Sequence, residues 1–526
     1  MRSNSDLIVV NAKCYIVDNH SMVCQAFAVK DGRIAAIGTT GEILNRYTSG
    51  NILDVAGKPI YPGFIDAHCH FYGYALSLRM VDLKGTGSFD GVLQILRQQF
   101  TGTDNDWIVG RGWDQNLWQG KAFPDRSKLD SLFPDRPVVL IRIDGHVVLA
   151  NDEALKRTGI GLKNKYKEGE VEIKNGRLTG ILSENAADHV KNSIPEPDDK
   201  ILSGLLKTAQ QNCFAVGLTG VSDAGLNYHI IRLIDSLQHK EVLKIHVYAM
   251  LEPTTENIEK FVKNGTYKTP GLTIRSFKMY ADGSLGSRTA LLKKPYSDDP
   301  LKTGIQVTPA DSIRQICRLA VKYGYQVNIH AIGDLANQVV LDIYGEFLKP
   351  GNDLRWRIEH AQVVDPVDLP KFKKYSVIPS IQTTHATSDM SWAGDRLGKE
   401  RIRWAYAYRD LLNQNGWIAN GTDFPVENIS PVLSFYAAVA RQDVNGNPPS
   451  GFQIKNGLLR EDALRSITLW AAKADFDDDE MGSLETGKRA DFVILDKDLM
   501  EIPYSEIPKI KVIKTFVDGK LVFSSD

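Results

Sequence analysis

The sequence predicts an α/β fold. We expect a (β/α)8 TIM barrel with a small β-sandwich domain formed by both chain termini and an inserted subdomain after the first barrel strand. Three observations support this prediction. Short β-branched runs alternate with helix-length segments, which is typical of βα units in a parallel sheet. Isolated polar residues follow several of these runs. They would therefore lie at the carboxyl ends of the strands, where a barrel has its active site. Both ends of the chain show the pattern of antiparallel hairpins instead.

Composition excludes several classes of function. The chain has 526 residues, with 63 basic and 64 acidic side chains and a formal net charge of -1. No general electrostatic attraction to nucleic acid or an anionic membrane is therefore expected, and a small-molecule substrate is the better expectation. No run resembles a secretory signal or a membrane span, which predicts a cytoplasmic protein. The oligomeric state is left open, with a homodimer as one option.

The two termini are predicted to share one domain. Residues 6–60 alternate apolar and polar runs around tight turns, and residues 490–495 and 515–523 repeat this pattern near the other end. Neither part has enough strands to bury a face alone. We therefore expect residues 1–60 and 476–526 to form a β-sandwich, and residues 61–475 to form the barrel.

The central region supplies eight candidate parallel strands. The first ends at His70. The other seven are residues 218–222, 244–249, 274–280, 325–330, 356–360, 377–382 and 417–420. Eight parallel strands with intervening helices form a closed barrel, whose active site lies at the carboxyl ends of the strands.

An insertion is expected after the first barrel strand. His70 and Lys278 are separated by far more chain than three βα repeats of about 30 residues require. The excess lies at about residues 72–200. Because an insertion at this point lies over the active-site mouth, we expect it to form a lid or a wall of the substrate site.

A His-Cys-His sequence is the most informative motif. His68 and His70 lie two residues apart, so on a strand both imidazoles project from the same face, while Cys69 points to the other face as a packed thiol. Neutral imidazole is a common metal ligand that suits zinc. Such a pair alone is weak support, but further polar residues recur at later strand ends: Lys278, His330, His360 and Asp423.

Several longer segments carry a resemblance to a known family. They are PGFIDAHCH at 62–70, KMYADGSLGSR at 278–288, HAIGD at 330–334, EH at 359–360, GTDFPVE at 421–427 and GKRADF at 487–492. Within the insertion, GRGWD at 110–114 and DGH at 144–146 belong to the same pattern. Together they resemble the amidohydrolase superfamily and, within it, the metal-dependent YtcJ-like branch, also called amidohydrolase family 3. The resemblance covers nearly the whole chain.

The resemblance implies a centre with two divalent metal ions, expected to be Zn²⁺. His68 and His70 would hold one ion, and His330 and His360 would hold the second. Asp423 would bind the first ion and contact the bridging water. Two ions that share a water generate hydroxide near neutral pH and polarise a carbonyl.

Lys278 is the unusual member of this set. A free ammonium group beside two dications would be repelled, but burial and positive neighbours lower a lysine pKa, and the neutral amine can add carbon dioxide. The resemblance implies that the resulting carboxylated Lys278 bridges the metal ions. The alternative is an unmodified lysine in a structural salt bridge beside a single metal ion.

The remaining polar residues are expected to have catalytic or structural roles. Asp423 is predicted to act as general base and then as general acid towards the leaving amine. His385, just past the seventh strand, either donates a hydrogen bond to the developing oxyanion or only packs. His146 either reaches the substrate or makes a structural hydrogen bond. Asp282 and Arg288 are expected to fix a loop, with a substrate carboxylate contact as the alternative.

The predicted function is a metal-dependent hydrolase that cleaves a non-peptide C-N bond, in an amide or an N-substituted formamide. The first alternative is a deaminase of similar fold. Such enzymes commonly use one metal ion and a glutamate on the segment of the fifth strand, and residues 330–334 contain no glutamate. The second alternative is a non-catalytic scaffold that kept the barrel fold but lost the chemistry. The presence of all six predicted ligands argues against this alternative.

Overall fold

An eight-stranded parallel sheet forms the centre of the molecule in this computed structural model, which describes residues 2–18, 20–100, 107–164, 166 and 169–525. The strands in spatial order are β10 (Phe64–Cys69), β17 (Leu218–Leu226), β18 (His246–Leu251), β20 (Leu272–Tyr280), β21 (Gln326–Ala331), β22 (Arg357–His360), β23 (Ile378–Ile381) and β24 (Ala419–Asn420). Each pairs in parallel with the next. All eight predicted strands are present, and the (β/α)8 fold class is confirmed.

The first and eighth strands meet just beyond their carboxyl ends. The backbone N-H of Asp423 donates to the carbonyl of His68 at 2.8 Å, and that of His70 donates to the carbonyl of Phe424 at 2.9 Å. Gly421 makes this approach possible, because a Cβ atom there would lie 2.4 Å from the backbone nitrogen of His68. The contact closes the barrel around the two ends that carry the His-Cys-His motif and Asp423.

Helices cover the outside of the barrel. They include α2 (Phe71–Ser77), α7 (Asp199–Ala215), α8 (Tyr228–His239), α10 (Ala310–Tyr323), α11 (Asp334–Phe347), α12 (Leu369–Tyr375), α15 (Tyr408–Asn415) and α16 (Pro431–Ala440). In α10, Ile313, Ile316 and Ala320 form a buried stripe at helical spacing, and the helix ends at Gly324 with φ +72°. Most of these helices bury one face against the strands, whereas α16 is buried over nearly its whole length.

Two sheets at the chain ends form the predicted sandwich. The first has the order β6 (Arg33–Gly38), β5 (Ala26–Lys30), β2 (Leu7–Val10) and β8 (Ile52–Asp54). The second has the order β27 (Lys520–Ser524), β26 (Val512–Val517), β25 (Phe492–Leu495), β9 (Pro59–Pro62), β3 (Lys13–Tyr15) and β4 (Val23–Cys24). The pairing of β25 with β9 joins the two ends of the chain. Phe27 and Phe492 pack between the sheets, with ring centroids 5.1 Å apart.

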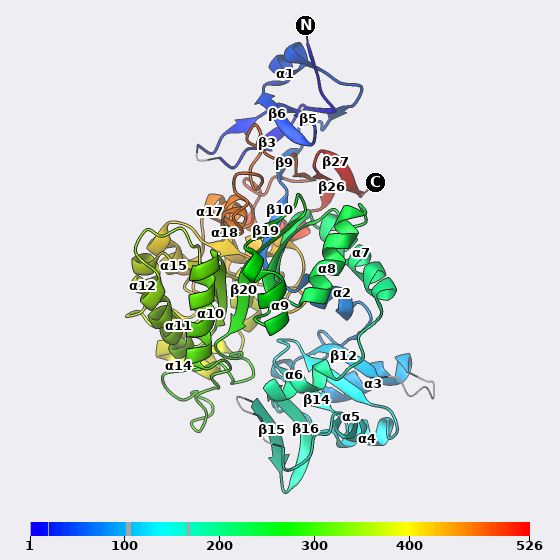
Figure 1. The fold of residues 1–526 in the computed structure, drawn as a ribbon, viewed down its shortest axis with the longest axis vertical. Coiled ribbons are helices and arrows are strands. Elements are labelled where there is room, and N and C mark those ends of the chain that lie inside the picture. Colours follow the sequence, from blue (N-terminus) through cyan, green and yellow to red (C-terminus); the bar gives the residue numbers. More distant parts are fainter. Residues whose placement is uncertain (1, 19, 101–106, 165, 167–168, 526) are drawn as a thin grey trace.

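The insertion forms its own mixed sheet. Its strand order is β11 (Val81–Asp82), β12 (Ile108–Trp113), β13 (Val138–Arg142), β14 (Val147–Ala150), β16 (Arg177–Glu184) and β15 (Gly169–Lys174). The helices α3 (Phe89–Gln99), α4 (Ser127–Leu132), α5 (Asp152–Arg157) and α6 (Asn185–Asn192) accompany it. Figure 1 shows the terminal sheets at one end of the long axis, the insertion at the other end and the barrel between them.

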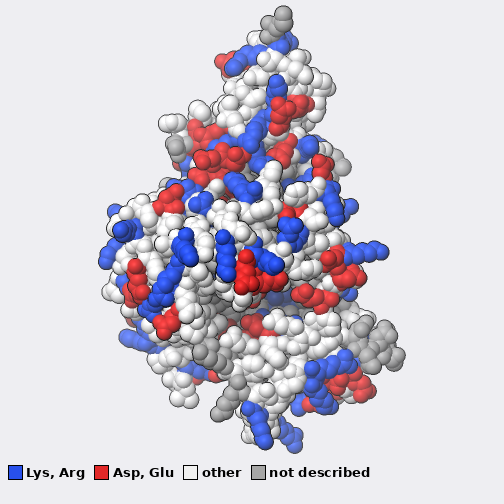
Figure 2. Space-filling model, viewed as in Figure 1, with Lys and Arg blue, Asp and Glu red and all other residues white. Residues whose placement is uncertain are grey.

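Surface features agree with the charge composition. In Figure 2, basic and acidic side chains are interspersed over the visible face, as the near-zero net charge predicts. Among the described helices, none has the length and apolar character needed to span a lipid bilayer.

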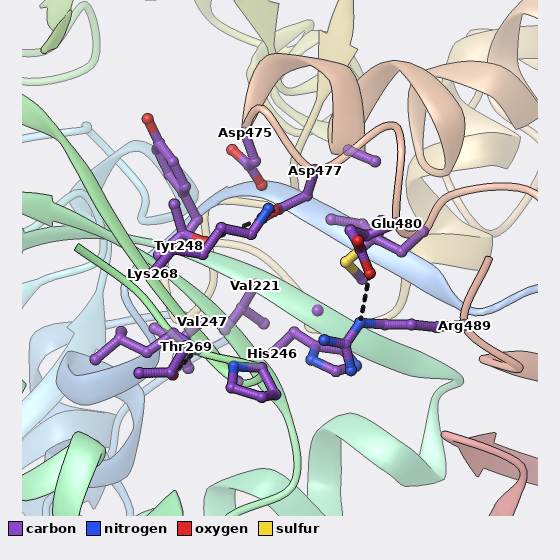
Figure 3. Close-up of a pocket in the computed structure, with 18 residues that line it drawn as sticks. Val221, His246, Val247, Tyr248, Lys268, Thr269, Asp475, Asp477, Glu480 and Arg489 are labelled. Atoms are coloured by element: carbon purple, nitrogen blue, oxygen red, sulfur yellow. Dashed lines mark hydrogen bonds and ion pairs between the residues drawn. The ribbon is translucent and has the colours of Figure 1, made fainter. Parts of the chain in front are cut away.

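A small crevice lies where the barrel meets the C-terminal segment, at the starts of β18 and β20 (Figure 3). Its charges are already paired. Lys268 Nζ lies 2.6 Å from Asp477, and Arg489 Nε lies 3.9 Å from Glu480. The first pair holds the C-terminal segment against the barrel, and the second lies within that segment.

A second group of acidic and imidazole side chains lies beside this crevice. Atoms of His246, Asp491 and Asp518 fall within 4.8 Å of one another, a spacing compatible with a metal ion. However, Arg489 Nη1 lies 2.9 Å from Asp518, and His246 Nε2 lies 2.9 Å from Asp491. Because a guanidinium cation already occupies one face of the group, we interpret it as an ion-pair network between barrel and sandwich.

Candidate metal centre

The six side chains predicted as metal ligands come together at the carboxyl ends of the barrel strands. Five of them line one large cavity: His70, Lys278, His330, His360 and Asp423. The sixth, His68, is completely buried directly beside them. The open space of the cavity is about 1120 Å³, its solvent-filled mouth included. Residues spread over most of the chain therefore meet at one site.

The two imidazoles of the His-Cys-His motif converge on a single carboxylate oxygen. His70 Nε2 lies 3.2 Å from Asp423 Oδ1, and His68 Nε2 lies 3.6 Å from the same atom. His360 joins them, because one ligand atom each of His68, His360 and Asp423 lies within 4.8 Å of the other two. The strand alternation predicted this convergence for His68 and His70.

His330 lies on the far side of His360. The ring centroids of His330 and His360 are 4.5 Å apart, and those of His68 and His360 are 5.0 Å apart. His330 Nε2 lies 3.1 Å from the carbonyl oxygen of Gly283, which leaves Nδ1 as the nitrogen available to a metal ion. His360 therefore lies between His68 and His330.

Lys278 is enclosed by the candidate ligands. Its side chain is buried, its Nζ lies 3.4 Å from His68 Nε2, and it lies 4.7 Å above the ring of Tyr280. Burial lowers the pKa of Lys278 to about 8, although the nearby carboxylates of Glu359 and Asp423 act in the opposite direction. The ammonium form therefore predominates at neutral pH, but a minor fraction of neutral amine, the form that reacts with carbon dioxide, is present beside it.

The protonation states fit a divalent cation. Burial lowers the pKa of His68, His330 and His360, so these rings are neutral and carry a free lone pair at neutral pH. Burial opposes ionisation of Asp423, but hydrogen bonding to His385 helps to hold its pKa well below the usual value. Moreover, His360 Nδ1 is buried and makes no hydrogen bond within the described chain. Nitrogen and carboxylate donors of this kind suit Zn²⁺.

Glu359 is a functional candidate to which the sequence reasoning assigned no role. Its Oε2 lies 2.7 Å from His68 Nδ1, which fixes the orientation of that ring. Adjacent strand residues normally face opposite sides, yet His360 has φ +73°, and this turn in the backbone lets both residues reach the site. The sequence signal that could have identified Glu359 was its position directly before His360, a predicted metal ligand.

Replacing Glu359 by Gln is expected to weaken metal binding. The amide keeps the shape and an acceptor for His68 but removes the negative charge that raises the basicity of the ring. We expect roughly a 10-fold loss of metal affinity. Competition with a chromophoric chelator measures it. Glu346→Gln, on the exposed face of α11, is the matched control, and equal affinities in both variants would contradict the role of Glu359.

His385 lies at the edge of the centre, on α13 (Thr383–Asp389). Its Nε2 lies 3.4 Å from Asp423 Oδ2, and the residue lines the cavity. Burial opposes the charged form of His385, but Asp423 and Glu427 raise its pKa to about 9. The structure thus brings His385 to Asp423, and its contact with a substrate oxygen remains a prediction.

Asp282 and Arg288 hold the loop after β20. The Asp282 carboxylate accepts hydrogen bonds from the backbone nitrogens of Ile332 at 3.0 Å and Gly333 at 2.8 Å. Arg288 Nη2 lies 2.8 Å from Asp298 Oδ2. These contacts agree with the loop-fixing role that the sequence predicted for both residues.

The insertion supplies one wall of the cavity. Its lining residues include Asp114, Leu117, Arg142, Ile143, Asp144 and His146. The barrel side adds the apolar side chains of Leu285 and Trp392. The cavity thus combines a polar floor of candidate ligands with a partly apolar outer wall.

Comparisons with known proteins agree with this arrangement. A family model described as "Amidohydrolase family" matches residues 51–523. A protein of Bacillus subtilis (strain 168) with the name "Putative amidohydrolase YtcJ" is 30% identical over 95% of this chain and 96% of its own. N-substituted formamide deformylase of Arthrobacter pascens is 26% identical over 99% of each chain.

A solved structure extends the likeness to three dimensions. The crystal structure of an uncharacterised metal-dependent hydrolase from Pyrococcus horikoshii OT3 superposes with a TM-score of 0.78 at 31% identity. The match covers 95% of this chain and 99% of that one. The family match spans the barrel, the insertion and most of the C-terminal segment, so the chain belongs to the amidohydrolase family.

Proposed function

We propose that the protein is a metal-dependent hydrolase of non-peptide C-N bonds, acting on an amide or an N-substituted formamide. The observation that carries this proposal is the convergence of four imidazoles, one carboxylate and a buried lysine at the cavity floor. The likeness to the Arthrobacter deformylase over almost the full length of both chains supports the formamide class.

The proposed cofactor is a pair of Zn²⁺ ions, with a carboxylated Lys278 between them. His68, His70 and Asp423 would hold one ion, and His330 and His360 the other. Ions bound in this way supply a hydroxide nucleophile near neutral pH and polarise a carbonyl group.

The protein's own side chains then manage the protons. Asp423 is ionised and faces the cavity, so it accepts the proton released on attack and delivers it to the departing amine. His385, held beside Asp423, donates a hydrogen bond to the carbonyl oxygen as negative charge develops there. The N-substituent of the substrate would lie against the apolar wall that includes Leu285 and Trp392.

Metal analysis tests the proposal most directly. About two ions per chain would support the hydrolase, one ion would favour the deaminase-like alternative, and none after purification in metal-supplemented buffer would favour a non-catalytic scaffold. A screen of amides and N-substituted formamides with zinc- or manganese-supplied protein then identifies the substrate.

Replacing His330 by Ala is expected to lower metal content and turnover together. The variant removes one of the two imidazoles assigned to the second ion, so about one ion per chain should remain. Elemental analysis and activity are measured on the same preparation. His229→Gln, in an exposed histidine on α8, serves as the control. Unchanged metal content in His330→Ala would count against the assignment of this ligand.

A further inference from the structure

The turn between β13 and β14 in the insertion is fastened to the barrel. Asp144 Oδ2 accepts hydrogen bonds from Ser284 Oγ and Ser287 Oγ, both at 2.5 Å, and Arg142 Nη1 lies 2.6 Å away. Burial opposes ionisation of Asp144, but these partners and His146 hold its pKa well below the usual value. Both serines belong to the loop that follows β20, the strand that carries Lys278. Their hydrogen bonds therefore fix the position of the turn relative to that strand.

This anchored turn presents His146 to the cavity. Its Nδ1 lies 2.9 Å from Glu184 Oε2, and the backbone nitrogen of Glu184 donates to the His146 carbonyl oxygen at 2.9 Å. Nε2 makes no hydrogen bond to any residue in the described ranges, although His146 lines the cavity and its side chain is 16% exposed. The ring is therefore held at one nitrogen and open to a ligand at the other.

The geometry of Glu184 is costly for the backbone. Its φ of 50° and ψ of −126° lie in a region that favours glycine and is strained for a residue with a side chain. Its carboxylate packs directly against Gly283, where a Cβ atom would lie 2.2 Å from Glu184 Oε1. Strain of this kind persists when the surrounding structure requires it, and it is concentrated at functional sites.

The His146–Glu184 pair directly adjoins the candidate metal ligands. The ring centroids of His146 and His330 are 5.2 Å apart. Gly283, which packs against the Glu184 carboxylate, also places its carbonyl oxygen 3.1 Å from His330 Nε2. His146 therefore belongs to the same side-chain cluster as the candidate ligands.

We propose that His146 contacts the substrate through Nε2, hydrogen-bonding one of its oxygen atoms, and that Glu184 is the positioning residue that holds the ring. The inference rests on the proposed hydrolase function and extends it, because it makes the insertion a part of the active site. His146 and His385 then face the substrate from the insertion and from the barrel respectively.

Kinetics of matched variants test this inference. His146→Gln is expected to lower kcat/KM about 10- to 100-fold, and Glu184→Gln about 3- to 10-fold, because the amide oxygen introduced by the second change would still accept a hydrogen bond from Nδ1. His189→Gln and Glu153→Gln, both elsewhere in the insertion, should change kcat/KM less than about 2-fold. Metal content and Tm should stay near those of the wild type. Loss of metal or a lower Tm without a change in kcat/KM would show a structural role and overturn the inference.

A binding measurement separates this inference from the proposed function. Zinc-loaded protein with ¹⁵N-labelled histidine is titrated with formate, the acyl product of formamide hydrolysis, and the spectrum of His146→Gln assigns the ring signal. We expect formate to shift the Nε2 signal of His146 and not that of His189. An unmoved His146 signal would overturn the inference. If formate shifts the Nε2 signal of His146 but the protein hydrolyses none of the amides in the screen, the contact of His146 with a substrate oxygen would be supported. The proposed hydrolase function would then be overturned.

Discussion

Replacing Asp423 by Asn is expected to lower kcat by about 10³-fold or more, the largest effect of any single change. A positioned general base contributes about 10²–10⁴ to the rate, and the amide cannot accept the proton. The same change removes a charge that His70 and His385 both contact, at 3.2 Å and 3.4 Å. Turnover of the best amide substrate and metal content are measured on the same protein.

A control keeps this result interpretable. Asp311→Asn replaces an exposed carboxylate that forms a surface ion pair with Arg314, so it should leave both kcat and metal content unchanged. Circular dichroism checks that Asp423→Asn is folded. If that variant kept kcat within about 10-fold of the wild type, Asp423 would not be the proton carrier.

Replacing Lys278 by Arg is expected to have the second largest effect. Arginine keeps a positive charge but cannot form a carbamate, so the variant should lose one of two metal ions and about 10²–10³-fold in kcat. Elemental analysis and turnover test both parts. Lys374→Arg, at the end of α12, is the matched control. Full metal content and activity in Lys278→Arg would exclude a carboxylated bridge.

The reaction with carbon dioxide should depend on pH in a defined direction. The pKa of Lys278 is lowered to about 8, so the ammonium form predominates below pH 8 and the reactive amine predominates above it. At a constant concentration of dissolved ¹³C-labelled carbon dioxide, reactivation of metal-stripped protein by zinc should therefore become faster from pH 7 to pH 9, with a ¹³C carbamate signal appearing in parallel. A rate that stays flat or falls over this range would contradict the prediction.

The barrel was predictable because its signals are local. Each βα unit has a β-branched run followed by a segment long enough for a helix, and the predicted strands at 325–330 and 356–360 correspond to β21 and β22. The pairing of the two termini followed from their short, alternating runs, which cannot bury a face separately. The four-stranded sheet built wholly from the N-terminal segment is a detail that only the structure shows.

The site was predictable where side chains project regularly from strands. The i, i+2 spacing of His68 and His70 aims both rings at one point, and Asp423 meets them there. Regular projection fails at His360, whose positive φ brings neighbouring Glu359 to His68, a residue far away in the sequence. Such a contact depends on the closed barrel, so no local pattern contains it.

The sequence by itself determined the fold class, the order of the strands and the residue types that gather at their ends, because these depend on short-range periodicity and on the fixed geometry of a parallel barrel. Only the tertiary structure decided which ligands lie nearest one another, with His360 between His68 and His330. It also decided that the insertion presents His146, held by Glu184, to the same cavity. The physical reason is that these arrangements depend on packing between segments that are distant in the sequence. If a strand paired with its neighbour one residue out of register, its side chains would point away from the site.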